Sequence, residues 1–261
     1  MIKINIDDRV YLKSGLLDVG GVNHCFTTKC GGVSCGNIKG LNLGFRVGDD
    51  VNAVIQNYKL VAKDMDFPYA RITAGRQTHS ANIRIITEAD AGKGISKESE
   101  FMDIDGLVTN VRGLPLVVYY ADCVPILLAD KTAGVVAAVH SGWRGTVGEI
   151  AGNAVKIMTE KFNAKAENIV AAIGPSIGPC CFETGGEVAC EFDSDLVIEH
   201  GNGKFMVDLW KANERILLKY GLRKQNIDVS EMCTICNRDM LYSYRVDKEA
   251  TGRMGAFISL A

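Results

Sequence analysis

The centre of the predicted sheet is formed by two apolar stretches, Tyr120-Ala-Asp-Cys-Val-Pro-Ile-Leu-Leu-Ala-Asp130 and Gly134-Val-Val-Ala-Ala-Val-His-Ser-Gly-Trp-Arg-Gly-Thr146. Each contains an unbroken apolar run, which is typical of a strand buried on both faces. Alternating or continuous apolar patterns predict further strands around them. These cover residues 3–6, 9–13, 22–28, 71–74, 82–86, 106–109, 115–120, 168–173 and 255–260.

Three helices are predicted from apolar residues at helical spacing. The first begins after a cap at Asp49 or Asp50 and ends near residue 65, with Val51, Ile55 and Tyr58 on one face. The others cover residues 147–162 and 209–220, and Val147 is expected to face inward. Because strand–helix–strand units alternate with hairpins, the sequence predicts an α/β fold of α+β character, a mixed β-sheet flanked by helices. No linker or repeat divides the chain, so residues 1–261 are expected to form a single domain.

The composition restricts the expected partners. A net charge of −2 gives no electrostatic reason to expect nucleic acid or an anionic membrane as a partner. No apolar stretch reaches bilayer-spanning length, and the N-terminus lacks the apolar segment of a secretory signal. Nine cysteines in such a chain fit a reducing compartment, so we expect a cytoplasmic protein. The absence of an obvious coiled coil or apolar surface helix favours a monomer.

Three side chains are candidate metal ligands: Cys123 and His140, at the edges of the two apolar runs, and His79, which lies upstream in a polar break. One thiolate and two imidazoles without a fourth ligand form the set of a catalytic zinc site, which keeps a position free for water or substrate. The residue types alone leave alternatives open, because an apolar strand often buries an inert cysteine. Pro125, inside the strand pattern, predicts an edge, a bulge or an irregular mouth at this point.

An anion site is predicted next to His140. Two glycines, Gly142 and Gly145, follow this histidine where a helix begins, and the free amides of a helix N-terminus attract anions. Arg144 adds a bidentate donor suited to phosphate or carboxylate. The sequence therefore predicts a metal centre beside an anion-binding group.

The remaining cysteines and histidines are not assigned to a site. Cys233-Thr-Ile-Cys236 has the spacing of a zinc-binding pair, but no second pair or histidine lies nearby in the sequence, so it is interpreted as structural or incidental. Vicinal thiols rarely share a zinc ion, so packing is the interpretation for Cys180-Cys181. His24 is an alternative ligand, and His200 is expected on a solvated loop.

Several segments, in order over nearly the whole chain, carry a resemblance to a known family. They are Leu41-Asn-Leu-Gly44, Gln77-Thr-His79, Asp105-Gly-Leu-Val-Thr109, Ala121-Asp-Cys-Val-Pro125, His140-Ser-Gly-Trp-Arg-Gly145, Ile173-Gly-Pro-Ser-Ile-Gly-Pro179, Tyr242-Ser-Tyr-Arg245 and Thr251-Gly-Arg253. In these segments the chain resembles the bacterial laccase-domain proteins, also described as polyphenol oxidoreductases, purine nucleoside phosphorylases or peptidoglycan editing factors. The resemblance places the zinc ligands of that family on His79, Cys123 and His140. Thr78 and Ser80 depart from the family, which usually has Val and Gly there, but the ligand between them is kept.

The resemblance implies purine nucleoside chemistry: phosphorolysis of adenosine, inosine and 5′-methylthioadenosine, with hydrolytic deamination of adenosine. Zinc can lower the pKa of a bound water to about 7, and we expect this water to attack purine C6 in deamination. In phosphorolysis, Arg144 with Arg76 and the helix amides would orient phosphate toward the ribose C1′.

Three further polar residues are candidates for a part in this chemistry. Asn42 and Asp105 are expected to contact the substrate or to support a histidine ligand. The alternatives are a turn residue for Asn42 and a local cap for Asp105. Glu183 is another candidate acid, with a surface carboxylate as the alternative.

The laccase name conflicts with the number of histidines. A multicopper oxidase combines a blue-copper site with a copper cluster, and together they need more imidazole ligands than the four histidines of this chain. A laccase of that kind is therefore excluded. A single adventitious Cu²⁺ can still compete with Zn²⁺ for one site of nitrogen and sulfur ligands.

Three other roles fit the same residues. The resemblance also implies a zinc-dependent amidohydrolase that removes misincorporated serine from a peptidoglycan precursor. Without a metal, Cys123 would be a nucleophile and His140 its base, as in cysteine hydrolases. A metal-storage or partner-binding domain is the non-enzymatic alternative. The sequence leaves the preferred purine and the physiological pathway open.

Overall fold

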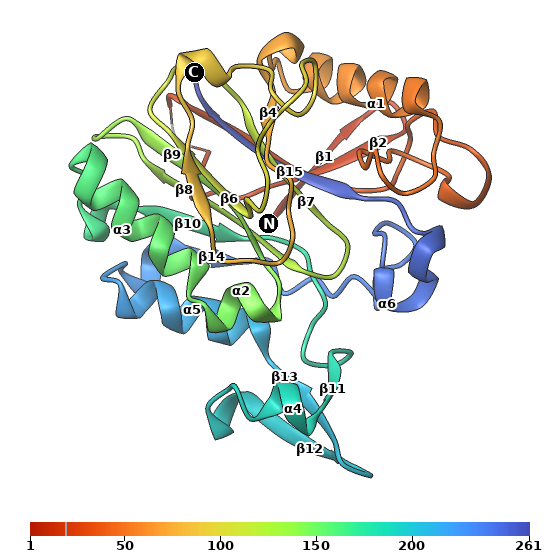
Figure 1. Cartoon of the computed structure of the whole chain (residues 1–261), viewed down its shortest axis with the longest axis vertical. Coiled ribbons are helices and arrows are strands. Elements are labelled where there is room, and N and C mark those ends of the chain that lie inside the picture. The colour runs from red at the N-terminus through yellow and green to blue at the C-terminus, as the bar shows by residue number, and fades with distance from the viewer. Residues whose placement is uncertain (19) are drawn as a thin grey trace.

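The computed structural model describes residues 1–18 and 20–261, and its body contains two six-stranded sheets (Figure 1). The first sheet consists, in spatial order, of Ile2–Ile6 (β1), Arg9–Lys13 (β2), Val22–Thr27 (β3), Met254–Leu260 (β15), Leu116–Tyr120 (β7) and Thr73–Ala74 (β4). The second consists of Ile227–Val229 (β14), Val170–Ile173 (β10), Val124–Asp130 (β8), Val135–Ser141 (β9), Gly106–Thr109 (β6) and Ile83–Ile85 (β5). Both sheets combine parallel and antiparallel pairs. The predicted fold class, a mixed sheet flanked by helices, is confirmed, but the structure has two such mixed sheets where one was predicted.

The two sheets pack face to face. Because alternate residues of a strand point to opposite faces of its sheet, each strand contributes side chains both to the core between the sheets and to the outer face. Leu127 of β8 belongs to the core between the sheets, together with Val118 of β7 and Ile258 of β15. Ile126 and Leu128 of β8 point the other way and pack with the helices outside the second sheet. Every residue of β8 and β9 is buried, as expected for strands covered on both faces.

Helices cover the outer face of each sheet (Figure 1). The three longer ones are Val51–Asp64 (α1), Ile150–Phe162 (α3) and Leu209–Lys219 (α5). Val54 and Tyr58 of α1 pack against Phe257 on the first sheet, while α3 and α5 lie on the second. The Asp50 carboxylate caps α1 by accepting the Asn52 amide, as predicted. No helix in the described part of the chain combines the length and the apolar character needed to cross a bilayer.

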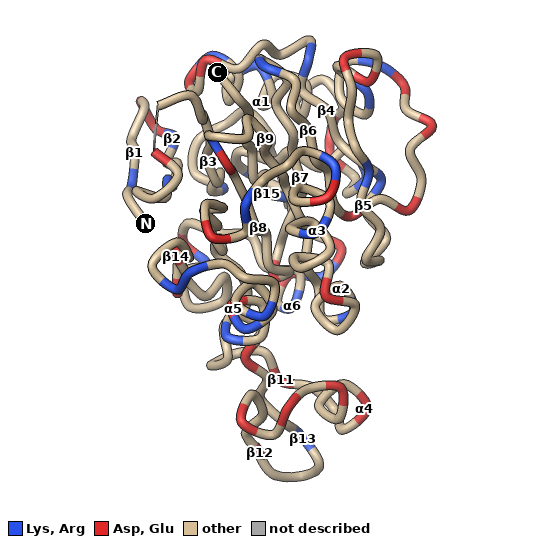
Figure 2. The backbone as a smooth tube through the Cα atoms, turned by 90° about the vertical axis from the view of Figure 1, so that its left-hand side faces the viewer, with Lys and Arg blue, Asp and Glu red and all other residues tan. Residues whose placement is uncertain are grey.

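A small three-stranded sheet projects from the body beside α5 (Figure 1). It is formed, in spatial order, by Glu183–Gly185 (β11), Lys204–Val207 (β13) and Val197–Gly201 (β12), and it carries a short helix, Gly186–Ala189 (α4). The sequence analysis did not predict these strands, because β12 is mostly exposed and lacks an apolar run. Acidic positions predominate in this projection, whereas acidic and basic positions are mixed over the body (Figure 2).

Four local predictions were wrong in whole or in part. The helix predicted over 147–162 is divided into Trp143–Val147 (α2) and α3, because Glu149 adopts a left-handed φ of 53°. Val147 is 39% exposed instead of facing inward. On α1, Val51 was predicted on the packed face but is exposed, and Val54 lies in the core instead. Pro125 does not mark an edge, because β8 lies between β10 and β9. It lies opposite Gly174, just beyond the end of β10, and its carbonyl accepts the Gly174 amide at 2.8 Å, so its missing amide hydrogen affects only the end of the ladder.

Candidate functional site

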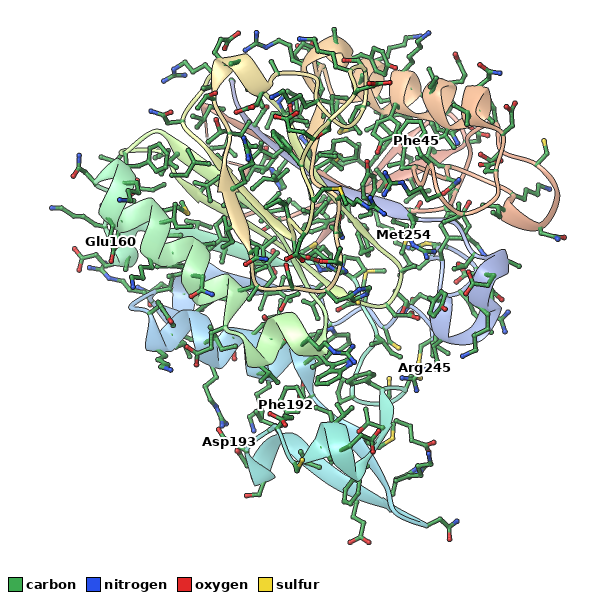
Figure 3. The ribbon with its side chains drawn as sticks, viewed as in Figure 1. Phe45, Glu160, Phe192, Asp193, Arg245 and Met254 are labelled. Carbon is green, nitrogen blue, oxygen red and sulfur yellow. The ribbon has the colours of Figure 1, made fainter. Side chains whose placement is uncertain are left out.

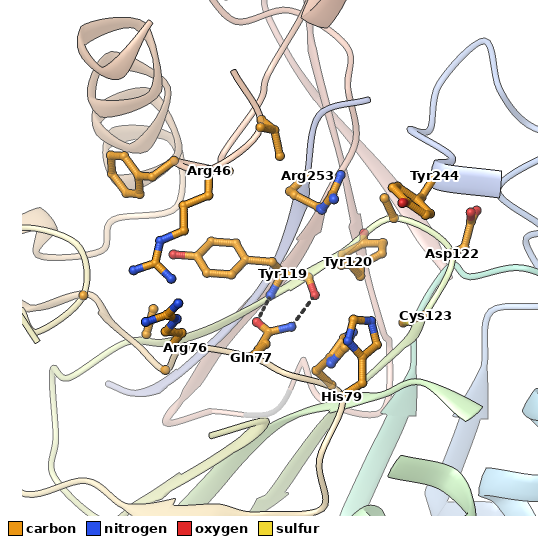
Figure 4. Close-up of a pocket in the computed structure, with 18 of the residues that line it drawn as sticks. Arg46, Arg76, Gln77, His79, Tyr119, Tyr120, Asp122, Cys123, Tyr244 and Arg253 are labelled. Carbon is orange, nitrogen blue, oxygen red and sulfur yellow. Dashed lines mark hydrogen bonds between the residues drawn. The ribbon is translucent and has the colours of Figure 1, made fainter. Parts of the chain in front are cut away.

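His79, Cys123 and His140 converge at one end of the second sheet (Figure 4). One ligand atom of each lies within 4.8 Å of the others, and the two imidazole centroids are 5.1 Å apart. Cys123 directly precedes β8 and His140 lies on β9, so the antiparallel pairing of Pro125 with His140 brings them together. His79 arrives on the loop between β4 and β5 with a φ of 67°, which is unusual for a residue with a side chain.

Asp105 supports two of these three residues from outside the cavity. Its carboxylate is fully buried. Oδ1 lies 2.7 Å from Nδ1 of His140 and accepts the amide of His79 at 3.0 Å. Oδ2 accepts the amides of Thr78 and Ser80 at 3.0 and 2.9 Å. Asp105 therefore engages one ring nitrogen of His140, which leaves Nε2 for the cluster, and it fixes the turn that carries His79.

The charges of the cluster favour a thiolate. Burial raises the pKa of the Cys123 thiol, but the adjacent His140 and His79 outweigh burial and lower this pKa to about 6. Burial lowers the pKa of His140, whereas Cys123 and Asp105 raise it to about 9. Burial likewise opposes ionisation of Asp105, but His140 and the loop amides lower its pKa to about 2. The cysteine is thus poised in the form that binds metals or attacks electrophiles.

The cluster lies at the floor of a cavity of about 1080 Å³. Tyr119 and Tyr120 of β7 line it, as do Phe45, Trp143 and Tyr244 from the surrounding loops and short helices. Such aromatic rings offer flat apolar faces to a ligand. The volume is at the upper end of the range typical of small-molecule sites, about 300–1,000 Å³.

Five arginines give this cavity a positive lining: Arg46, Arg76, Arg144, Arg245 and Arg253. None of the five forms an ion pair with a carboxylate of residues 1–18 or 20–261, although other arginines of the chain do so. Three carboxylates, of Glu98, Asp122 and Glu249, also line the cavity, but none is within ion-pair distance of these guanidinium groups, which therefore stay available to an anion. The electrostatics therefore favour a ligand that carries phosphate or carboxylate groups.

Arg144 and Arg76, both predicted site residues, line the cavity on different walls. The guanidinium of Arg144 lies 4.2 Å from the ring centroid of Trp143 at the start of α2. Arg76 contacts Met102 at 3.2 Å, from Nη1 to Sδ. The loop of Arg76 is tied to β7 because the Gln77 amide bonds to both backbone groups of Tyr119, at 2.8 and 2.7 Å (Figure 4).

Asn42 and Asp105, predicted as substrate contacts, both lie outside the cavity lining. Asn42 is fully buried, and its Oδ1 accepts the amides of Gly44 and Arg253 at 2.9 and 2.8 Å. Its Nδ2 donates to Asp49 at 2.7 Å. Asp105 therefore supports a histidine ligand, which is one of the roles considered for it. Asn42 contacts no histidine; its bond to the Gly44 amide is that of a turn residue, the alternative considered for it.

The other two histidines lie away from the cluster. His24 is buried in β3, where its Nε2 accepts the Ser14 amide at 2.9 Å. His200 lies on the exposed strand β12 instead of a loop, and it pairs with Glu183 at 2.8 Å. Glu183 is thus engaged outside the cavity lining. Only two of the four imidazoles meet, which leaves no ligand set for a multicopper centre.

Sequence reasoning missed three of the arginines and a second cluster. Arg46 and Arg253 lie on separate loops and Arg245 lies in the short helix Tyr244–Asp247 (α6). Arg245 and Arg253 occur in the Tyr242–Arg245 and Thr251–Arg253 segments that resemble the family, which is the signal that could have found them. Cys233 and Cys236 were interpreted as structural or incidental and Cys180-Cys181 as packing, and their meeting in one group was not predicted. Cys180, Cys181, Cys233 and Cys236 place their sulfur atoms within 4.8 Å of one another, because their loops lie side by side in the fold.

Known proteins resemble this chain over nearly its full length. The profile of the family described as "multi-copper polyphenol oxidoreductase laccase" matches residues 23–261. A purine nucleoside phosphorylase, YlmD of Geobacillus stearothermophilus, is 37% identical over 96% of this chain and 94% of its own. An adenosine deaminase, RL5, from an unknown prokaryotic organism is 37% identical over 84% of this chain and 87% of its own. The crystal structure of YlmD from Geobacillus stearothermophilus superposes with a TM-score of 0.92 at 35% identity, covering 98% and 97% of the two chains.

Proposed function

The chain belongs to the multi-copper polyphenol oxidoreductase laccase family, and we propose that it is a zinc-dependent purine nucleoside phosphorylase that also deaminates adenosine. The proposed substrates are adenosine, inosine and 5′-methylthioadenosine with inorganic phosphate, handled by a single domain over residues 1–261. One observation carries the proposal: His79, Cys123 and His140 converge beneath arginines that have no carboxylate partner in the described chain.

The three convergent residues fit a zinc ion. A thiolate and two imidazoles are preferred zinc ligands, and three protein ligands facing a cavity match the open arrangement of catalytic sites. Bound zinc would supply a Lewis acid and lower the pKa of water to about 7. Asp105 would keep His140 in the tautomer that presents Nε2. Cu²⁺ would compete for the same ligands, although two imidazoles give no support for multicopper oxidation.

The cavity offers separate groups to the phosphate and the base. Gly142 lets α2 approach the cluster, because a Cβ there would lie 3.1 Å from Sγ of Cys123. Arg144, two residues later, would therefore hold phosphate close to the cluster, and Arg76 would add charge from another wall. Aromatic faces such as Tyr119 and Tyr244 would pack against the purine. This division of roles would bring phosphate oxygen toward the ribose C1′ with the base held apart.

Two other hydrolytic reactions would use the same residues. An amidohydrolase acting on a peptidoglycan precursor would place the diphosphate of a nucleotide-linked substrate on the arginines. A cysteine hydrolase would use the Cys123 thiolate as nucleophile and His140 as its acid–base partner. The cysteine-hydrolase mechanism gives His79 no role. Yet His79 has a left-handed backbone, and Asp105 holds it in place by accepting its amide. This additional imidazole favours the metal.

The proposal is tested by incubating the purified protein with inosine, adenosine or 5′-methylthioadenosine, with and without phosphate. We expect phosphate-dependent release of the purine base and a ribose 1-phosphate product, and phosphate-independent conversion of adenosine to inosine. Cys123→Ala is the inactive variant, and Cys190→Ala, at an exposed cysteine outside the cavity lining, is the matched control. Turnover no greater than that of Cys123→Ala with every nucleoside would refute the proposal.

Two further arms of this experiment separate the alternatives. Release of serine from a UDP-muramoyl-serine precursor, without turnover of nucleosides, would assign the amidohydrolase. Activity that survives complete zinc removal but is lost on alkylation with iodoacetamide would assign the cysteine hydrolase.

A further inference from the structure

A second group of sulfur atoms lies outside the cavity lining, formed by Cys180, Cys181, Cys233 and Cys236. Cys180 and Cys181 lie in the turn that follows β10, and the other two lie in the loop that follows β14. These strands are parallel neighbours, with Ile173 opposite Val229, so their following loops leave the sheet at the same edge. The topology therefore places two pairs of cysteines together that are far apart in the sequence.

The distances between the sulfur atoms suit four ligands of one ion. Sγ of Cys236 lies 3.6 Å from Sγ of Cys180 and 3.7 Å from Sγ of Cys181, and the four atoms span no more than 4.8 Å. A disulfide would require about 2 Å. Tetrahedral zinc with bonds of about 2.3 Å separates its sulfur ligands by about 3.8 Å. A multi-iron cluster distributes its cysteines over several metal atoms, so this tight group fits a single ion better.

The backbone around the sulfur atoms is held in place by the protein itself. A Cβ on Gly178 would lie 2.6 Å from the Trp210 ring and 3.2 Å from Cβ of Cys233, so glycine permits the close approach of the two loops. Ser176 forms a parallel bridge with Cys233 and accepts the Thr234 amide at 3.0 Å. The four thiols are therefore brought together by folding, as a preformed site requires.

We propose that Cys180, Cys181, Cys233 and Cys236 bind a zinc ion in a closed four-thiolate site. Four sulfur–zinc bonds form and the four thiols release four protons to solvent, with no change in oxidation state. Four sulfur ligands complete a tetrahedral zinc shell, so this site has no position for substrate. Its role is structural, and it does not depend on the reaction proposed for the cavity.

The site would also support the neighbouring catalytic cluster through Asp122, the residue before Cys123. Asp122 has a φ of 88°. Its Oδ1 accepts the Thr234 hydroxyl at 2.6 Å, and its carbonyl accepts the Ile177 amide at 2.8 Å. Each of the two loops that the zinc would join therefore contributes one bond that holds Asp122. The backbone amide of Arg245 in the first turn of α6 (Tyr244–Asp247; Figure 3) gives it a third at 2.6 Å.

Metal analysis of freshly purified protein tests the site directly. We expect two zinc equivalents for the wild type and for Cys190→Ser, one for Cys236→Ser, one for Cys123→Ser and none for the double variant. With Co²⁺ in place of zinc, Cys236→Ser should lose most of the thiolate-to-cobalt absorption, because it disrupts the site with four thiolates. A single equivalent in the wild type that Cys236→Ser keeps and Cys123→Ser loses, or two equivalents retained by Cys236→Ser, would overturn the proposal.

Thiol reactivity of the wild type gives a test that does not depend on a variant folding. Cys180 and Cys236 are exposed, as are Cys35 and Cys190 outside the cluster. In zinc-loaded protein, alkylation mapped by mass spectrometry should modify Cys35 and Cys190 first and spare the exposed pair until a chelator is added. Equal reaction of all four before chelation, or a disulfide within the cluster, would contradict the zinc site.

Discussion

Two clusters of soft ligands lie near one another in this protein, and they differ in composition and in surroundings. His79, Cys123 and His140 offer one thiolate and two imidazoles at the floor of an arginine-lined cavity. The second cluster offers four thiols, held between two loops, and none of these cysteines lines the cavity. Three ligands leave a zinc position free for chemistry, whereas four thiolates fill the shell. The number of ligands, more than the presence of cysteine, separates an active centre from a structural one.

The two clusters also differ in how the fold assembles them. Cys123 and His140 belong to adjacent antiparallel strands, and His79 is carried by a loop that runs from the first sheet to the second. The four-cysteine cluster joins the loops after two parallel strands of one sheet. Loss of the first should therefore affect chemistry, and loss of the second should affect the stability of those loops.

The largest effect is expected from Cys123→Ser. Removal of the only thiolate from the three-ligand cluster should lower kcat/KM for phosphorolysis by more than about 100-fold, since even partners behind a ligand contribute about 10–100-fold. The melting temperature should change little, because the four-cysteine cluster is intact. The measurement is steady-state release of hypoxanthine from inosine, with Cys190→Ser as control. Near wild-type turnover in Cys123→Ser would exclude the cluster from catalysis.

A large loss of stability is expected from Cys236→Ser. Structural zinc sites contribute directly to the folding free energy, so the variant should lose several kcal/mol of unfolding free energy. Urea denaturation followed by circular dichroism measures this loss in zinc-loaded wild type and variant. Adding a chelator should remove most of the difference between the two proteins. If the two differ equally with and without zinc, the four cysteines act through packing alone.

Asp105→Asn should weaken the catalytic cluster and leave the other unchanged. The substitution removes the carboxylate that faces Nδ1 of His140 and receives the loop amides, so we expect about a 10–100-fold loss of zinc affinity at this site. Competition with a chromogenic chelator measures the two zinc ions separately if they differ in affinity. A loss of the zinc held by Cys236 and its partners would contradict independent sites.

The buried His24 provides a reference imidazole that belongs to neither cluster. Burial lowers its pKa to about 4. In the unfolded chain this histidine has an ordinary pKa of about 6.5. Between pH 6.5 and 4 it therefore binds a proton in the unfolded state but stays neutral in the folded state. Stability should therefore be full above pH 6.5 and fall as the pH drops toward 4, by about 2 kcal/mol at pH 5.

His24→Gln tests this expectation, since glutamine can still accept the Ser14 amide but does not titrate. The free energy of unfolding, measured for both chelated proteins from pH 7 to 5, should fall less steeply in the variant. Identical slopes would show that other groups govern the acid sensitivity.

The smallest effect is expected from Arg144→Gln. Charge-assisted bonds to an anion contribute about 1.5–3 kcal/mol each, but four other arginines remain in the cavity, so KM for phosphate should rise about tenfold. Arg215→Gln removes a surface arginine that pairs with Asp195 and should leave KM unchanged. An unchanged KM for phosphate in Arg144→Gln would show that Arg144 does not bind the phosphate and would leave this role to the other arginines.

Much of the body could be predicted because β8 and β9 are buried on both faces and therefore carry unbroken apolar runs. The projection formed by β11, β12 and β13 could not, since β12 exposes nearly all its residues and has no such pattern. The division between α2 and α3 was missed for a local reason. Glu149 adopts a left-handed conformation that its residue type does not favour.

The candidate site was partly visible in the sequence for chemical reasons. Cys123 and His140 stand out at the edges of apolar runs, and His79 stands in a polar break upstream of them. The four-cysteine cluster was not predicted, because its two pairs meet only through the parallel pairing of β10 with β14. Arg144 and Arg76 of the cationic lining were predicted, but Arg46, Arg245 and Arg253 were not, because they come from loops and a short helix that are distant from them in the sequence.

Diffraction data collected at the zinc absorption edge would locate both ions in one experiment. We predict one anomalous peak bounded by Sγ of Cys123, Nε2 of His140 and a ring nitrogen of His79, with a non-protein ligand on its cavity side. A second peak should lie within the four cysteine sulfur atoms. Zinc-loaded crystals that lack a peak between the two histidines and Cys123 would contradict the metal centre on which the proposed chemistry depends.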